Sequence, residues 1–279
     1  METFREQKSS TEIESKVKSY QEKYLPEGMR SQKKVNLVIA AGLDLMYARQ
    51  ANFEGLEKLP EKGPFIVIAN HFNVKETELL LATLKNYDAH VVAAKKIIGE
   101  HPITKIGLKA IRGITVPESL AHLSTEEKEE LLSRIPSGII KTKYQEVIAQ
   151  EAAGEVDRSG LIQFIRSSVA LLSRGDVLVI YPEGLWLYDG ENGESRNHTL
   201  YRGLDGFNIV AEQYKKLTGE NVPIIPVSIY KDKTQHSVKI GNPSFISDNP
   251  TELSDTDWYM QQIGEMLPED QRGHYKSSK

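Results

Sequence analysis

Short continuous runs of apolar residues recur along the chain, and each has the length of a strand. The clearest run is 65–69, which follows a turn at 60–64 and contains no polar residue, as in a strand that is buried on both faces. Similar runs predict three further strands, at 90–94, 177–181 and 223–229.

The segments between these runs carry apolar residues at helical spacing. They predict helices at 77–84, 161–172 and 206–217. Strands that alternate with helices indicate an α/β fold, here with a mixed, mostly parallel central sheet flanked by helices. We expect this sheet domain to span residues 53–279.

Residues 119–160 differ from the rest of the sheet domain, because they are highly charged and favour helices throughout. Breaks are expected at 136–138, which contains Pro and Gly, and at Gly154. We interpret this stretch as a helical insertion that forms a flap over one end of the sheet.

Residues 1–52 are predicted to form an N-terminal helical segment. Up to about Lys23 the sequence is rich in Glu, Lys, Gln and Ser, which is typical of an exposed helix or a partly disordered stretch. From 33 to 50 apolar residues fall at helical spacing behind Lys33 and Lys34. This amphipathic helix either packs on the core or lies on a membrane surface, and the pattern favours neither.

Composition excludes several classes of function. The 279-residue chain has a formal net charge of −4, so no general attraction to nucleic acid is expected. It has no cysteine, which removes disulfides, thiolate metal sites and cysteine nucleophiles. The chain has neither the roughly 20 apolar residues of a membrane span nor a secretory signal. We expect a cytoplasmic protein, peripheral on the inner face of the membrane if the 33–50 helix binds lipid.

A polar cluster, ANHFNVKE at 69–76, follows the first buried strand and enters the next helix. A carboxylate at Glu76 that accepts from Nδ1–H of His71 would leave Nε2 free to take a proton. Because imidazole titrates near pH 6.5, such a pair serves as a general base at neutral pH. Taken alone, the pattern also fits a helix-capping loop with a surface histidine.

Two further segments offer groups that bind polar ligands. YPEGLW at 181–186 follows another predicted strand and places Glu183 and Gly184 on a turn. The basic segment IGLKAIRG at 106–113 contains Arg112 and is preceded by Lys95. The guanidinium of Arg112 suits contact with phosphate.

The segment VPIIPV at 222–227 has two prolines within an apolar run. Proline has no N–H to donate to a neighbouring strand, so this pattern predicts an edge or bulged strand rather than a central one.

Taken together and in this order, the four segments resemble the glycerolipid acyltransferase family, whose best-known members acylate lysophosphatidic acid. The family has Asn-His with an acidic residue five after the His, a basic Gly-to-Arg segment, a Phe-Pro-Glu-Gly-Thr-Arg type turn and a Val-Pro-Ile-Val-Pro strand. The resemblance spans about residues 64–241, and 267–275 is similar to the tails of some bacterial members.

The resemblance implies an O-acyltransferase that moves a fatty acyl group from acyl-CoA or acyl-carrier protein to a hydroxyl of a glycerolipid such as a lysophospholipid. His71 would be its general base, and Glu76 would stand where the family usually has Asp. The resemblance implies no cofactor and no metal. The residues implied to bind substrate are Asn70, Lys95, Arg112, Glu183, Gly184 and Pro226.

The chain departs from the family at Leu185 and Trp186, which stand where the family has Thr and Arg. An apolar pair cannot replace the hydrogen bonds of a guanidinium to phosphate. Three readings follow: Arg196, His198 or Arg202 supplies the charge, the acceptor carries no phosphate, or the chain is a catalytically inert lipid-binding member of the fold. A serine esterase is disfavoured because no Gly-x-Ser-x-Gly elbow occurs.

Overall fold

The computed structural model describes residues 2–26, 29, 51–71, 74–94, 113–117, 119–120, 123–134, 139–155, 157–184, 200–232 and 235–276. Within these residues one seven-stranded sheet has the strand order β1-β7-β6-β2-β5-β3-β4. Its strands are β1 (Ala51–Glu54), β2 (Phe65–Ala69), β3 (Ala89–Ala94), β4 (Ile114–Val116), β5 (Val177–Ile180), β6 (Ile224–Asp232) and β7 (Gln235–Ile240).

All neighbouring strands pair in parallel except β6 and β7, which are antiparallel. The sheet is therefore mixed and mostly parallel, and the predicted α/β class is confirmed. Each of the four apolar runs forms a strand, and 65–69 is matched without shift by β2. β1, β4 and β7 were not predicted from the sequence.

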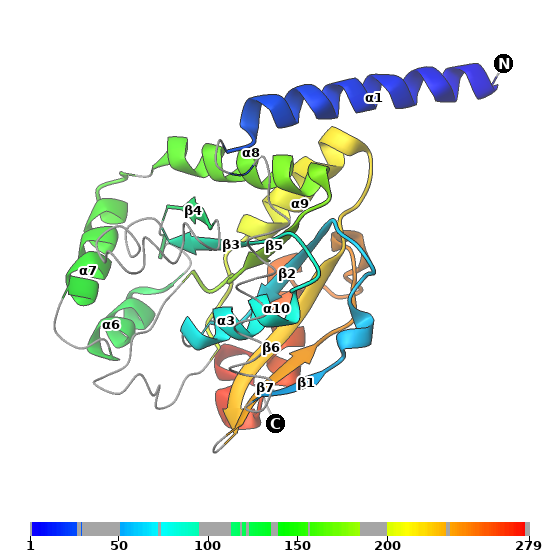
Figure 1. Ribbon diagram of the computed structural model, residues 1–279. Helices are drawn as coiled ribbons and strands as arrows, with labels where there is room; N and C mark the ends of the chain where they lie inside the picture. Colours follow the sequence, from blue (N-terminus) through cyan, green and yellow to red (C-terminus); the bar gives the residue numbers. More distant parts are fainter. Residues whose placement is uncertain are drawn as a thin grey trace.

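Helices lie on both faces of this sheet (Figure 1). The predicted helices at 77–84, 161–172 and 206–217 correspond to α3, α8 and α9. The helices are α1 (Glu2–Tyr24), α3 (Val74–Thr83), α6 (Thr125–Arg134), α7 (Ile139–Ala152), α8 (Arg158–Arg174), α9 (Gly206–Thr218) and α10 (Asp255–Met266), with short 3-10 helices η2 (Leu56–Lys58), η3 (Ile246–Asp248), η4 (Glu269–Gln271) and η5 (Gly273–Tyr275).

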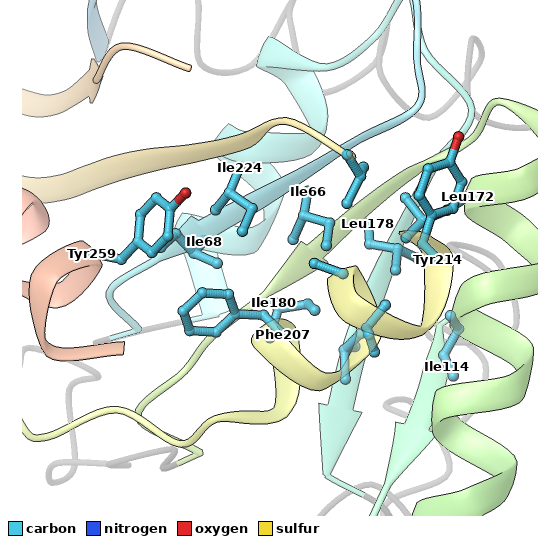
Figure 2. Packing of buried hydrophobic residues seen from close by; sticks show 14 of the residues in the cluster. Ile66, Ile68, Ile114, Leu172, Leu178, Ile180, Phe207, Tyr214, Ile224 and Tyr259 are labelled. Carbon is cyan, nitrogen blue, oxygen red and sulfur yellow. The ribbon is translucent and has the colours of Figure 1, made fainter. Parts of the chain in front are cut away.

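Alternate residues of β2 supply two separate cores, because successive side chains of a strand point to opposite faces. Ile66 and Ile68 meet α8, α9 and α10, where Phe207 packs edge-on against Tyr259 with ring centroids 5.6 Å apart (Figure 2). Phe65, Val67 and Ala69 face leucines of α3 instead. With every residue of β2 buried, the end of this strand is a rigid support for the residues that follow it.

β6 is an interior strand between β7 and β2, so the prediction of an edge strand was wrong. The carbonyl of Pro226 accepts a 2.8 Å hydrogen bond from the N–H of Gly241, on the side of β6 that faces away from β2. The ring nitrogen of Pro226 lies on that same side, because the nitrogen and the carbonyl of one strand residue point the same way. Antiparallel pairing with β7 begins only at Val227. A Cβ on Gly241 would lie 2.7 Å from Pro226 Cγ, so the glycine leaves room for the proline ring.

The N-terminal residues form the helix α1, and its C-terminal half packs on the domain. Tyr20 joins the core beneath it, and the guanidinium of Arg166 lies 5.0 Å from the ring centroid of Tyr24. Its other half extends past the rest of the molecule (Figure 1). The amphipathic segment 33–50 lies outside the described residues. Among the described helices, none has both the length and the apolar character needed to cross a bilayer.

Two helices, α6 and α7, lie within the predicted insertion and stand apart from the helices that cover the sheet (Figure 1). They share a small core of their own with Leu120 and Tyr201. Glu151 of α7 accepts hydrogen bonds from Ser119 Oγ at 2.8 Å and from Leu120 N at 2.7 Å, which fastens the start of the insertion to its second helix. A flap role for these helices stays a prediction.

Candidate active site

Two adjacent parallel strands bring sequence-predicted residues to the same edge of the sheet. β2 and β5 pair with Ile68 opposite Ile180, so the segments that follow them leave the sheet side by side. His71 follows β2 and Glu183 follows β5. The backbone N–H of His71 donates a 3.0 Å hydrogen bond to Glu183 Oε1. The segments 69–76 and 181–186 therefore meet directly.

The imidazole of His71 is half-buried and stacks on the ring of Tyr181. The two ring centroids lie 4.1 Å apart, with an angle of 24° between the planes. The Tyr181 hydroxyl is 2.9 Å from Thr77 Oγ1, which links the end of β5 to helix α3. The stack therefore fixes the plane of the histidine ring, while His71 as a residue is partly exposed.

Asn70 is fully buried, and its side chain acts as an extension of the sheet. Its amide nitrogen donates to the carbonyl of Ile229 at 2.7 Å, and its amide oxygen accepts from the N–H of the same residue at 2.8 Å. The amide thereby ties the end of β2 to β6 just where the backbone ladder stops, and this fixes the position of His71. Direct contact of Asn70 with substrate stays a prediction.

Glu183 is almost completely buried, with 2% of its surface exposed. Its second oxygen, Oε2, accepts from the backbone N–H of Tyr201 at 2.9 Å. Gly184 then turns the chain with φ of 62°, and a Cβ there would lie 2.7 Å from the side chain of Leu204. Glycine is favoured at this position both by its left-handed backbone and by the lack of space.

The segment 200–202 is held from the other side by the C-terminal tail. The N–H of Leu200 donates to Gln271 O at 2.9 Å, and His274 N donates back to Leu200 O at 3.0 Å. Arg202, a candidate phosphate contact, donates through Nε to His274 Nε2 at 3.1 Å. The tail, which resembles those of some bacterial family members, thus supports the neighbourhood of the site.

Tyr275 of this tail is mostly buried beside the site. Burial raises the pKa of its hydroxyl far above the ordinary value, and the hydrogen bond to Asp257 together with the charges of Asp257 and Glu183 adds to this. The hydroxyl therefore stays protonated and donates to Asp257 Oδ1 at 2.8 Å.

Several predicted site residues lie outside the described residues. Position 76 lies in the first turn of α3, directly beyond the loop that follows His71, but the Glu76 side chain is outside the described residues. Lys95, Arg112, Leu185, Trp186, Arg196 and His198 also lie outside them. The predicted pairing of His71 with Glu76 and the basic contacts to phosphate therefore stay predictions.

Pro226 lies in β6 opposite Ile68, close to where β2 ends. Its place in the sheet agrees with a supporting position beneath the site, while contact with substrate stays a prediction. In the described part of the chain, no three His, Asp or Glu side chains gather in a way that could hold a metal ion.

A second histidine–carboxylate pair, which sequence reasoning missed, lies at the opposite end of the sheet. His90 Nε2 is 2.9 Å from Asp176 Oδ2, and His90 is fully buried. Burial alone would raise the pKa of Asp176, but hydrogen bonds and charges from His90 and Arg174 outweigh it, so the pKa is lowered. Because Asp176 precedes β5 and His90 stands near the start of β3, the pair faces away from the carboxyl ends of the strands.

A family model described as Acyltransferase matches residues 50–230, a span that includes His71 and Glu183. No curated protein matches the sequence. One solved structure similar to this chain is the 1-acyl-sn-glycerophosphate (LPA) acyltransferase PlsC from Thermotoga maritima. The two are 16% identical with a TM-score of 0.47, over 83% of this chain and 76% of that one.

Proposed function

Because this chain belongs to the acyltransferase family, we propose that it transfers a fatty acyl group from an acyl-CoA or acyl-carrier protein thioester to a hydroxyl of a glycerolipid, with His71 as general base. The observation that carries the proposal is the placing of His71. It stands at the carboxyl end of a fully buried strand and is partly exposed, with its backbone fixed by Glu183 and its ring stacked on Tyr181.

In the proposed reaction the acceptor hydroxyl gives its proton to Nε2 of His71 as its oxygen attacks the thioester carbonyl carbon. The tetrahedral intermediate collapses with cleavage of the C–S bond. The departing thiolate takes the proton from the imidazolium, which yields an ester and a free thiol and restores the neutral base. Glu76 would hold the imidazole in the required tautomer by accepting from Nδ1–H.

We propose a lysophospholipid as the acceptor, with Lys95 and Arg112 as the groups that meet its phosphate. Arg202 supports this proposal, because it follows Tyr201, whose N–H bonds to Glu183, and carries an exposed guanidinium that contacts His274. Its bond to the imidazole of His274 leaves other guanidinium donors available, since arginine has five. The substitution of Leu185 and Trp186 for the usual Thr and Arg favours the competing proposal of a phosphate-free acceptor.

The experiment is a thiol-release assay with acyl-CoA against lysophospholipids, glycerol phosphate and phosphate-free lysolipids. We expect acceptor-dependent release that falls by roughly 10²–10⁴-fold in His71→Ala. Stimulation by phosphate-free acceptors alone would replace the lysophospholipid proposal. Absence of acceptor-dependent release with every acceptor would exclude the proposed transfer and favour the inert lipid-binding alternative. Acceptor-dependent release that His71→Ala leaves unchanged would exclude His71 as the base.

We also propose peripheral membrane contact through residues 33–50. Replacing Lys33 and Lys34 by Gln should weaken binding to anionic vesicles by about 30-fold, since each lysine near such a surface contributes about 1 kcal/mol. Lys62→Gln, at an exposed position elsewhere, is the matched control. Unchanged binding of the double variant would mean that this segment packs on the core.

A further inference from the structure

Glu183 joins two backbone segments that secondary structure does not connect. Its Oε1 accepts from the N–H of His71 at 3.0 Å and its Oε2 accepts from the N–H of Tyr201 at 2.9 Å. Neither His71 nor Tyr201 lies in a helix or strand, so these bonds supply what a sheet ladder would otherwise supply.

This geometry differs from that of a carboxylate which receives a substrate. An acceptor-binding group has to present an oxygen to the substrate, whereas 98% of the surface of Glu183 is covered and each of its oxygens already accepts a backbone N–H. Hydrogen bonds to an ionised carboxylate are about twice as strong as those between neutral groups. Such bonds suit a permanent link better than one exchanged with a ligand in each turnover.

The far end of the link is itself well supported. The side chain of Tyr201 is buried in the small core that α6 and α7 form with Leu120. The preceding residue, Leu200, exchanges two backbone hydrogen bonds with the C-terminal tail. A displacement of the insertion or the tail would therefore reach His71 through Tyr201 and Glu183.

We infer that Glu183 is a positioning residue, whose carboxylate holds the His71 loop at a fixed distance from the segment on which the insertion and the tail pack. This rests on the proposed function only in naming His71 as the base. The carboxylate sets the place of the histidine backbone, and the stack on Tyr181 sets the plane of its ring.

The test compares Glu183→Gln with Glu183→Asp. The Gln variant keeps one acceptor oxygen but sets an NH₂ group against an N–H, whereas Asp keeps both acceptors on a shorter side chain. We expect Glu183→Gln to lower kcat by roughly 10- to 100-fold with acceptor KM within about twofold, and Glu183→Asp to recover part of kcat. A raised acceptor KM with unchanged kcat would overturn the inference and restore acceptor binding to this residue.

Asp176→Asn is the matched control, because Asp176 is a buried carboxylate at the other end of the same strand. It should lose stability while keeping kcat per folded molecule. If Asp176→Asn lowers kcat as much as Glu183→Gln does, the effect of Glu183 is general destabilisation and the inference fails.

Amide hydrogen exchange on the unaltered protein covers the case in which Glu183 variants do not fold. The amides of His71 and Tyr201 should exchange as slowly as the adjacent β2 amides, although both lie in loops. Exchange of either amide at the rate of an unprotected loop would overturn the inference. This measurement needs no turnover, so it separates failure of the link from failure of the proposed reaction.

Discussion

Strand β5 has a buried carboxylate near each end, and the two have different partners. Asp176, before the strand, contacts the side chains of His90 and Arg174. Glu183, beyond its other end, contacts the backbone of His71 and Tyr201. A search for a histidine beside a carboxylate would choose the first pair, yet His90 is fully buried, whereas His71 is partly exposed. Access and strand direction, rather than the pair itself, therefore separate a candidate catalytic histidine from a structural one.

The largest expected effect distinguishes the two histidines. His71→Ala should lower turnover by roughly 10²–10⁴-fold with little change in melting temperature, because the ring is the proposed base and is partly exposed. His90→Gln, which keeps a donor for Asp176, should leave turnover per folded molecule unchanged and lower the melting temperature. Thiol release and thermal unfolding check both variants. A loss of turnover in His90→Gln without loss of stability would contradict the comparison.

Asp176→Asn should destabilise the fold by about 3–5 kcal/mol, the usual cost of removing one partner from a buried ionic pair. The loss is expected because Arg174 also donates to the carbonyl of Met29, so the cluster joins β5 to the chain that follows α1. Urea unfolding measures the effect. Glu57→Gln, at the surface, is a suitable control. Asp205 is exposed but contacts Thr256, so a change there is not suitable.

Acid should remove this contribution of Asp176. Its pKa is lowered in the folded state, so the stabilisation is fully present above the unfolded value of about 3.9 and is lost as pH falls through the lower folded value. The stability difference between the unaltered protein and Asp176→Asn should therefore narrow below about pH 4. Urea unfolding at a series of acidic pH values checks this. If the stability difference between the two proteins stayed constant down to pH 2, the carboxyl of Asp176 would have the same pKa in the folded and unfolded states, which would contradict the prediction.

The same comparison explains which parts of the molecule the sequence could predict. β2 and β5 were found because strands buried on both faces are continuous apolar runs. β7, with the sequence QHSVKI, and β1, with the sequence ANFE, both mix polar and apolar residues, so neither has that pattern. Pro226 led to the wrong prediction of an edge strand. The cost of its missing N–H depends on which side of the strand the proline nitrogen faces, and neighbours far away in the sequence determine that side.

Candidate site residues could be named from the sequence where polar residues lie next to a predicted strand end. His71 and Glu183 each lie two residues after an apolar run, and this local pattern, together with the other motifs, makes them candidates. Tyr201 is 18 positions from Glu183 and His90 is 86 positions from Asp176, so only the folded chain brings these partners together. The ring stack of His71 on Tyr181 has the same origin, because it depends on β2 and β5 being neighbours.

The smallest expected effect concerns this stack. Tyr181→Phe keeps the ring against His71 but removes the hydroxyl that contacts Thr77. Losing one neutral hydrogen bond costs about 1 kcal/mol, so kcat should fall by no more than about fivefold. Tyr181→Leu also removes the aromatic face and should lower kcat further, while acceptor KM stays within twofold in both variants. Equal kcat in the two variants would mean that the ring does not orient the imidazole, and the backbone link through Glu183 would then have to hold His71 without it.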